Sequence, residues 1–320
     1  MQATCSLVLV AIFAGAGKGQ AQQAFPAKPV RIVVPFSPGS QTDIVARLVG
    51  PKLNGIWGQP VIIENRAGGS GVAGANLVAK AEPDGHTILL TSSAFVIGAA
   101  LQNHLPYDAI KDFSGVTQIG YTTGVLVVSP ELGVKSVAEL IQFARNHSTK
   151  LLAGSTGPGS STFMNVELFR MAAGVQVTHV GFKGQPEFLV EILGGRIHIA
   201  VAGLGPALPF IKNGRLLALA VGTPVRSSVL PDIPAMAEIL AGYKKDGSYA
   251  LLAPARTPRA IINRISSDIG RVLDLADVRE PLERIGFVPS PTSPEEHDRI
   301  LRAQIDTFSG IVHQAGLRTP

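Results

Sequence analysis

The stretch VRIVVPFSPGSQTDIVARL, residues 30–48, decides the fold of this chain. It opens with an apolar run, from Val30 to Phe36, of the kind that a strand buried on both faces requires. Prolines, glycine and serines then break the extended pattern, and apolar residues recur at helical spacing from Ile44 to Val49. The stretch therefore predicts a buried parallel strand, a tight turn and a helix that begins at about Ser40.

The predicted turn has the properties of an anion-binding site. A helix start leaves backbone N–H groups unpaired and carries the positive end of the helix dipole, so it can hold an anion without Arg or Lys. We interpret residues 37–42 as a cradle for a carboxylate or phosphate. The alternative is that Ser40, Thr42 and Asp43 only cap their own helix. This turn alone does not decide between the two interpretations.

Length and composition indicate a large folded protein. With 320 residues, 46% hydrophobic and 16% charged, the chain can bury a large core and fits two domains better than one. The net charge of +5 is compatible with anionic ligands. Its basic residues are scattered, and the longest adjacent pair that we find is Lys244-Lys245, which argues against a nucleic-acid partner.

The N-terminal segment is typical of an export signal. Residues 7–17 are apolar and small, and Gly19-Gln20-Ala21 offers the small residues that a signal peptidase reads. We predict a signal peptide over residues 1–21, with cleavage after Ala16 as the other option. No later segment approaches about 18 uninterrupted apolar residues. Cleavage would remove Cys5, the only cysteine, which excludes disulfides and thiolate chemistry from the mature chain.

Two further strand–helix units follow the first. Val61–Glu64 is predicted as a strand and Gly69–Ala81 as a helix, and Thr87–Thr91 is the next strand. Three such units in a row imply a mostly parallel sheet with helices on its faces. Ser92 and Ser93 stand at the carboxyl end of the third strand, which is the edge where open α/β sheets bind ligands. They would also cap the next helix, and the two roles are compatible.

A second set of α/β units begins near residue 125. Its sequence LLAGSTGPGSS, residues 151–161, has the same pattern as the first turn: a short strand, a Gly-Ser-Thr loop and the start of a helix. This helix start is a second candidate anion-binding site. We place the second lobe at residues 125–247. The C-terminal helices are expected to pack back onto the first lobe, which then comprises residues 25–124 and 248–320.

Enzyme motifs are largely missing from the sequence. Gly69–Gly74 matches G-x-G-x-x-G, but the next strand ends without the acidic residue that would hold a ribose, so we assign these glycines to tight strand–helix packing. The seven histidines form no H-E-x-x-H pattern, and His179 and His198 are predicted to be hydrogen-bonded core residues. No G-x-S-x-G elbow, P-loop or EF-hand loop occurs. We predict no cofactor and no metal.

Together, the motifs of this chain resemble one family, the substrate-binding receptors of tripartite tricarboxylate transporters (Bug receptors, TctC-like). The resemblance covers nearly the whole mature chain. It rests on the following segments: PVRIVVPFSPGSQTD at 29–43, VIIENRAGGSG at 61–71, PDG at 83–85, LPYD at 105–108, KDF at 111–113, GSTGPGS at 154–160, HVGFKG at 179–184 and LPDIP at 230–234.

This resemblance implies a periplasmic-binding-protein-like α/β fold in which two lobes close on a small organic carboxylate and deliver it to the membrane permease of the transporter. In the family, the ligand carboxylate is held largely by backbone amides and hydroxyls of the two Gly-Ser turns, often through water. Two departures bear on the ligand. The family usually has Gly-Gly at Gly39-Ser40 and Pro-Tyr at Gly181-Phe182.

We expect a monomer, in the periplasm, with no nucleic-acid partner. The alternative function is a secreted enzyme on a doubly wound α/β fold, and a third is the ligand-sensing part of a regulator. The sequence leaves open whether the ligand is an aliphatic di- or tricarboxylate, an aromatic acid or an acidic amino acid. The predicted ligand-binding residues are Phe36, Ser37, Gly39, Ser40, Gln41, Thr42, Ser92, Ser93, Ser155, Thr156, Gly157, Gly159, Ser160, Ser161, Lys183 and Gly203.

Overall fold

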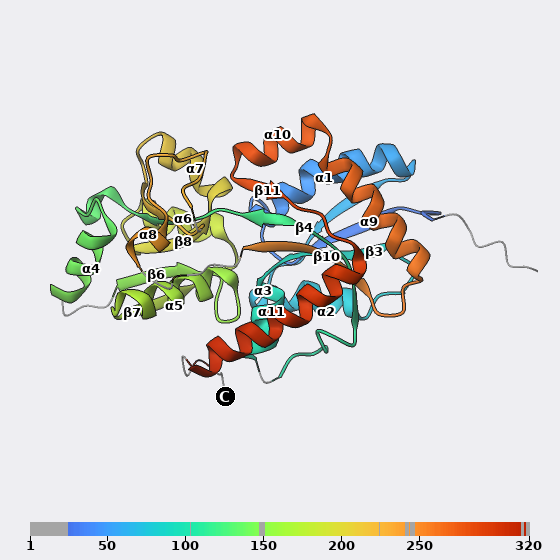
Figure 1. Cartoon of the computed structure of the whole chain (residues 1–320), viewed down its shortest axis with the longest axis horizontal. Helices are drawn as coiled ribbons and strands as arrows, with labels where there is room; N and C mark the ends of the chain where they lie inside the picture. The colour runs from blue at the N-terminus through green and yellow to red at the C-terminus, as the bar shows by residue number, and fades with distance from the viewer. Residues whose placement is uncertain are drawn as a thin grey trace, which may run out of the picture.

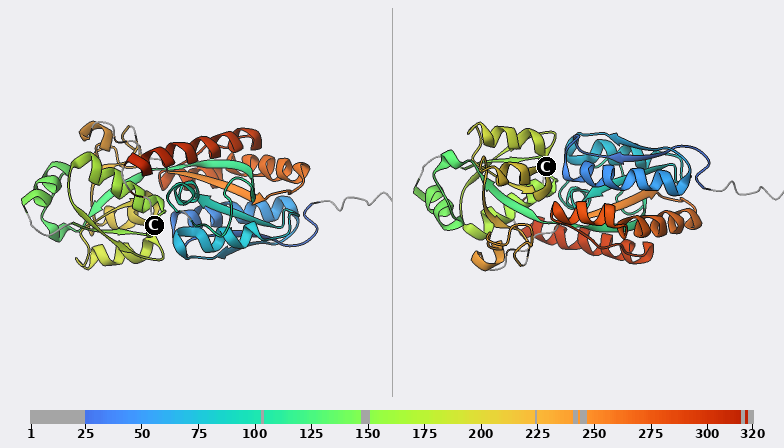
Figure 2. Two further views of the ribbon diagram at one scale, coloured as in Figure 1. Left: turned by 90° about the horizontal axis from the view of Figure 1, so that it is seen from below. Right: turned by 90° about the horizontal axis from the view of Figure 1, so that it is seen from above.

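Two α/β lobes lie side by side along the long axis of the molecule (Figures 1 and 2). The computed structural model describes residues 25–102, 104–146, 151–223, 225–240, 243, 247–314 and 317. The predicted signal peptide and Cys5 lie outside these residues. Each lobe is built on its own sheet, and the described chain passes from one sheet to the other where β4 runs into β5 (Figure 1).

The sheet of the first lobe has six strands in the order β11-β4-β10-β3-β1-β2. Its strands are β1 (Val30–Val34), β2 (Val61–Asn65), β3 (Thr87–Ser92), β4 (Phe113–Thr122), β10 (Ser248–Pro254) and β11 (Phe287–Pro289). One face is covered by α1 (Gln41–Trp57), α9 (Arg259–Leu273) and α10 (Ala276–Arg284). The other is covered by α2 (Val72–Ala79), α3 (Ala94–Leu101) and α11 (Pro294–Gln314).

The sheet of the second lobe has five strands in the order β7-β6-β8-β5-β9. They are β5 (Gly124–Val128), β6 (Leu151–Ser155), β7 (Val177–Gly181), β8 (Ile199–Gly203) and β9 (Leu217–Val221). Helices α4 (Val137–Asn146), α5 (Ser161–Ala173) and α8 (Met236–Ile239) pack on one face. Helices α6 (Gln185–Leu193) and α7 (Leu204–Lys212) pack on the other. Two 3₁₀ turns, η1 (Gly69–Gly71) and η2 (Pro130–Leu132), complete the described elements.

The first strand and helix form as the sequence predicts. Side chains of β1 alternate between two cores, with Ile32 and Val34 in one and Val33 in the other, so the strand is buried on both faces. Ser40 caps the start of α1 by accepting a hydrogen bond from the amide of Asp43. A left-handed Gly58 ends the helix. This local chemistry fixes the position of the turn between β1 and α1.

The strands of the three predicted strand–helix units, β1, β2 and β3, are parallel as expected, but the sheet as a whole is mixed. β1 is parallel to β2 and β3, but β10 is antiparallel to both β3 and β4, and β11 is antiparallel to β4. The second sheet is also mixed, because β5 is antiparallel to β8 and β9. The physical reason is that β4 runs onward into the second lobe and β10 enters from it, so these connections are not strand–helix–strand crossovers. The sequence of β4, with glycines and polar residues at many positions, gave no apolar run that predicted this strand.

Gly74 shows why the G-x-G-x-x-G pattern is structural here. A Cβ at this position of α2 would lie 2.7 Å from Pro35 Cβ and 2.9 Å from Pro35 Cα, at the end of β1. Any side chain would push α2 away from the sheet. The interpretation as a packing residue is confirmed for Gly74.

His297 is a buried titratable residue between α11 and β4. Its side chain is 2% exposed, and neither ring nitrogen has a hydrogen-bond partner among the described residues. Burial lowers the pKa of His297 from 6.5 to about 4, because a buried imidazolium lacks its hydration. The neutral form is therefore the one that packs in the folded protein.

We predict that this histidine makes the fold acid-sensitive. In the unfolded chain His297 takes up a proton at about pH 6.5, whereas in the folded protein it does so at about pH 4, so stability falls as the pH drops between these values. The loss attributable to His297 is about 3 kcal/mol. Urea unfolding of wild type and His297→Gln at pH 7, 5.5 and 4 measures it. Parallel pH dependences of the two proteins would contradict the assignment.

Candidate functional site

A polar cavity lies where the two lobes meet. It consists of two small adjoining compartments, of about 20 Å³ and 10 Å³, that share Ser92, Ser161, Thr162, Gln185 and Tyr249. The first compartment is also lined by Phe36, Ser40, Thr42, Thr156 and Gly184. The second is also lined by Ser93, Thr122, Asn165, Val201, Gly203 and Gly247. Both lobes thus contribute hydroxyl and amide groups, and no lining residue carries a formal charge.

The start of α1 presents free backbone donors to this cavity. The amide of Gly39, which precedes the helix cap, donates to Asp43 Oδ2 at 2.8 Å. The amide of Asp43 donates to Ser40 Oγ at 3.3 Å. The amides of Gln41 and Thr42, in the first turn, have no hydrogen-bond partner among the described residues. Ser40 and Asp43 therefore cap the helix, and two donors are left over.

Asp43 holds this turn in shape. Besides the Gly39 amide, it accepts hydrogen bonds from Arg47 Nε at 2.9 Å and from Asn65 Nδ2 at 2.9 Å. Burial raises the pKa of Asp43, but the hydrogen bonds from Arg47, Gly39 and Asn65 outweigh it, so the pKa lies below its ordinary value. The carboxylate is ionised at neutral pH and occupies the outer edge of the turn.

The start of α5, in the second lobe, repeats this arrangement without an acidic residue. Ser160 Oγ caps the helix by accepting from the Phe163 amide at 3.1 Å. Thr162 Oγ1 accepts from the Thr156 amide at 2.9 Å and so fixes the preceding loop. The amides of Ser161 and Thr162 have no partner within the described part of the chain. Two helix starts, one from each lobe, therefore face the same cavity with unpaired donors.

The structure brings together many of the predicted site residues. Those that line the two compartments are Phe36, Ser40, Thr42, Ser92, Ser93, Thr156, Ser161 and Gly203. Others only support the loops: Ser155 Oγ accepts from the Gly157 amide at 3.3 Å, and Ser160 is the cap of α5. Gly159 packs against α3 of the first lobe, where a Cβ would lie 2.8 Å from Gln102 Nε2.

Gln41 and Ser37 make contacts between the lobes. Gln41 is fully buried, and its Oε1 accepts a hydrogen bond from the Gly205 amide of α7 at 3.0 Å. Ser37 Oγ donates to Glu187 Oε1 at 3.4 Å. These two side chains hold one lobe against the other and do not line either compartment.

A groove at the solvent side of the cavity contains Lys183. It shares Phe36 and Thr156 with the first compartment and is also lined by Gly157, Phe182 and Glu187. Lys183 is exposed, and its backbone amide donates to Glu187 Oε2 at 2.9 Å. The groove is open to solvent and adjoins the first compartment at these two shared residues.

Sequence reasoning missed five polar residues that line the cavity: Thr122, Thr162, Asn165, Gln185 and Tyr249. Asn165 follows Ser161 by four positions on α5, so the helical period could have placed it on the same face. Gln185 begins α6 and its Oε1 accepts from the Gly203 amide at 2.9 Å. Burial raises the pKa of Tyr249, so its hydroxyl stays protonated and can donate. Tyr249 lies in a strand whose pattern indicated only core packing.

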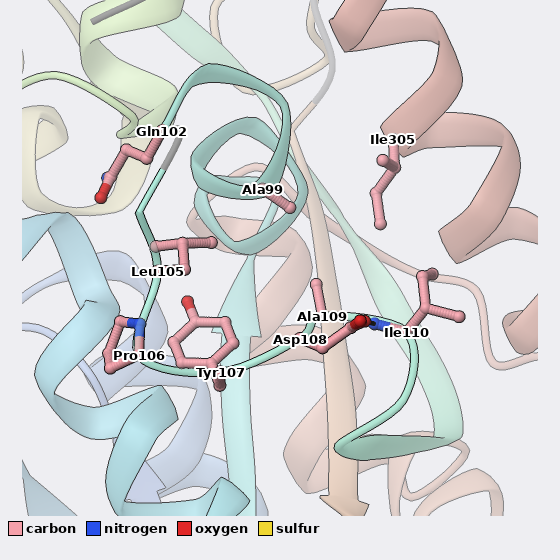
Figure 3. A pocket seen from close by; sticks show the side chains of 9 residues that line it. All are labelled: Ala99, Gln102, Leu105, Pro106, Tyr107, Asp108, Ala109, Ile110 and Ile305. Atoms are coloured by element: carbon pink, nitrogen blue, oxygen red, sulfur yellow. Dashed lines mark hydrogen bonds between the residues drawn. The ribbon is translucent and has the colours of Figure 1, made fainter. Parts of the chain in front are cut away.

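A separate hollow lies between α3, the loop at residues 105–110 and α11 (Figure 3). Tyr107 of this loop packs its ring against Phe95 and Phe113, and Asp108 Oδ1 accepts from the Ile110 and Lys111 amides at 2.9 Å. The LPYD segment is therefore a packed turn. Among the described residues, no three His, Cys, Asp or Glu side chains are grouped as a metal site requires, and no helix is long and apolar enough to cross a membrane.

Comparison with known proteins identifies the class. Solved structures superpose on this chain: "R. palustris Rpa4515 with adipate" gives a TM-score of 0.88 at 32% identity and covers 91% of this chain and 98% of its own. "MatC (Rpa3494) from Rhodopseudomonas palustris with bound malate" gives 0.84 at 29% identity and covers 90% and 100%. BugD gives 0.89 at 23% identity, which supports the fold.

The family follows from the sequence comparisons. The profile of the "Tripartite tricarboxylate transporter family receptor" matches residues 45–317. Protein BugT of Bordetella pertussis (strain Tohama I) is 31% identical over 326 residues, covering 99% of both chains. The chain belongs to the receptor family of tripartite tricarboxylate transporters and is a solute-binding receptor. The resemblance noted in the sequence is confirmed.

We predict that Asp43→Asn weakens both the fold and the site. An Asn nitrogen in place of Oδ2 faces the donors of Gly39 and Arg47, and each lost charged hydrogen bond costs about 1.5–3 kcal/mol. The stabilisation by Asp43 is present above its unfolded pKa and is lost as the pH falls through its lowered folded pKa. Urea unfolding should show a larger difference from wild type at pH 7 than at pH 3. Asp306→Asn, an exposed position on α11, is the control; an equal effect there would contradict the prediction.

Proposed function

We propose that this receptor captures a small organic carboxylate in the polar cavity between its lobes. The observation that carries the proposal is the convergence of two helix starts, those of α1 and α5, whose unpaired amides face one enclosed cavity. Helix N-termini favour anions, and neutral hydroxyls and amides complete a shell of donors. That solved relatives are described with bound adipate and malate supports the carboxylate class.

The cavity favours a single carboxylate group over a group that carries two charges at one place, such as phosphate or sulfate. Its lining has no Arg or Lys to balance a second negative charge, and a buried charge must be compensated by hydrogen bonds. One carboxylate group can be satisfied by the four helix-start amides and the Tyr249 hydroxyl. Ordered water can bridge the remaining gaps. The remainder of the ligand would extend toward the groove that holds Lys183.

We propose the following wider assignments for the chain. It acts in the periplasm after removal of residues 1–21, as a monomer, and passes its ligand to membrane permease subunits of a tripartite transporter. Its lobes comprise residues 25–124 with 248–320, and residues 125–247, which agrees with the strands that each sheet contains. It is a binding protein and not an enzyme, since its family and its ligand-bound neighbours are binding proteins.

The test of the ligand class is a titration of the mature chain with a panel. The panel contains malate, adipate, citrate, benzoate and aspartate, with inorganic phosphate and sulfate as other anions. Calorimetry should detect binding of at least one carboxylate and weaker or no binding of phosphate and sulfate. Tight binding of phosphate alone would contradict the proposal, and turnover of a bound compound would favour the enzyme alternative.

We predict that Tyr249→Phe weakens the binding of whichever ligand this panel identifies. Loss of one hydrogen bond to a charged ligand costs about 1.5–3 kcal/mol, which is roughly a ten- to hundredfold loss of affinity. Tyr107→Phe is the matched control, because Tyr107 is also a buried tyrosine but lines the hollow of Figure 3. Calorimetry measures the affinity of each variant for this ligand. Equal affinities of the two variants would mean that the ligand does not contact Tyr249.

A further inference from the structure

Ser70 connects the two lobes at the solvent side of the cavity. Its Oγ donates a hydrogen bond of 2.8 Å to the carbonyl oxygen of Thr156. Ser70 belongs to η1 of the first lobe, and Thr156 belongs to the loop before α5 of the second. Both residues line the open groove, and Thr156 also lines the first enclosed compartment. The bond thus spans the route between solvent and the cavity.

The backbone of Ser70 is in an unfavourable conformation. Four consecutive residues have positive φ: Gly68 at 145°, Gly69 at 55°, Ser70 at 57° and Gly71 at 104°. Glycine adopts such angles freely, whereas a residue with a Cβ does so only at a cost. Three of the four positions are glycine, and the exception is the residue whose hydroxyl reaches the opposite lobe. Strain of this kind persists where the surrounding structure compensates for it.

The acceptor of this bond is part of the candidate anion site. The Thr156 amide donates to Thr162 Oγ1, and Thr162 lies in the first turn of α5, whose free amides face the cavity. The approach of the two loops is close, because a Cβ at Gly157 would lie 3.1 Å from Ser70 Oγ. A separation of the lobes at this point would break the bond.

We propose that Ser70 is a positioning residue that acts as a clasp: its hydrogen bond to Thr156 holds the lobes closed over the ligand, and its backbone strain is released when they open. This role rests on the proposed two-lobed receptor function, because a clasp has meaning only where closure retains a ligand. The bond favours the closed form and the strain favours the open form. The clasp therefore sets how readily the lobes open without touching the ligand.

Two substitutions separate the bond from the strain. Ser70→Ala removes the hydrogen bond but keeps a Cβ in the left-handed backbone, so the ratio of closed to open protein should fall roughly five- to tenfold. Ser70→Gly removes the bond and the strain together and should lie between Ser70→Ala and wild type. Arg256→Ala is the matched control, since Arg256 also has positive φ, at 69°, and lies in the loop between β10 and α9. This control should leave the ratio unchanged.

The measurement is the distance between two spin labels in the protein without added ligand. The labels sit on cysteines introduced at Lys80, after α2, and at Met171, on α5, both exposed and in different lobes, with Cys5 replaced by serine. Pulsed electron resonance then gives the populations of the short and long distances. A larger long-distance population in Ser70→Ala than in wild type and Arg256→Ala is the expected result.

An equal ratio in Ser70→Ala and wild type, or a wild type that shows only the open distance, would overturn the clasp. An equal change of the closed-to-open ratio in Arg256→Ala would also overturn it. The effect would then arise from placing alanine at any residue with positive φ, and not from the lost hydrogen bond. The measurement does not depend on which ligand binds. Failure of the carboxylate panel would refute the proposed ligand class, whereas an unchanged distance ratio would refute only the role of Ser70.

Discussion

The carboxylate of Asp43 shapes the part of the molecule on which the cavity depends. It accepts hydrogen bonds from the Gly39 amide, Arg47 and Asn65, and thereby fixes the turn between β1 and α1 against β2. Because Asp43 uses the outermost amide, the amides of Gln41 and Thr42 are left for an external anion. The two interpretations of this turn, helix cap and anion cradle, are therefore both compatible with the structure, since different amides of the same turn serve each role.

The parts of this molecule that follow from the sequence are those determined by neighbouring residues. The end of β1, the cap at Ser40 and the Gly-Ser loop before α5 are set by apolar periodicity and capping chemistry, which act over a few positions. Tyr249 and the antiparallel direction of β10 depend on residues far away in the chain. The pattern of β10 is that of a core strand, and nothing local distinguishes the tyrosine that lines a cavity from one that packs in a core. The boundaries of the lobes and the ligand contacts stay predictions.

An uncharged cavity has physical consequences for binding. Each helix start offers only two unpaired amides, so neither lobe alone can replace the hydration of a carboxylate. The donors of both lobes are needed together, and the ligand then favours the arrangement in which they meet. Neutral donors also limit the total attraction, because no Arg or Lys in the lining holds the anion. Such a site can bind its ligand and still release it to a partner.

The contacts between the lobes differ in how far their atoms would separate when the lobes open. Gln41 and Gly205 meet close to the connection between the sheets, where Leu204 donates to the carbonyl of Thr123, so a rotation there moves the atoms little. Ser70 and Thr156 meet at the open groove, where the same rotation separates them further. A hydrogen bond at the groove therefore has more influence on opening than one beside the connection. In the proposed clasp, the strain at Ser70 is released together with this larger movement, which would account for a serine at a position where glycine costs less.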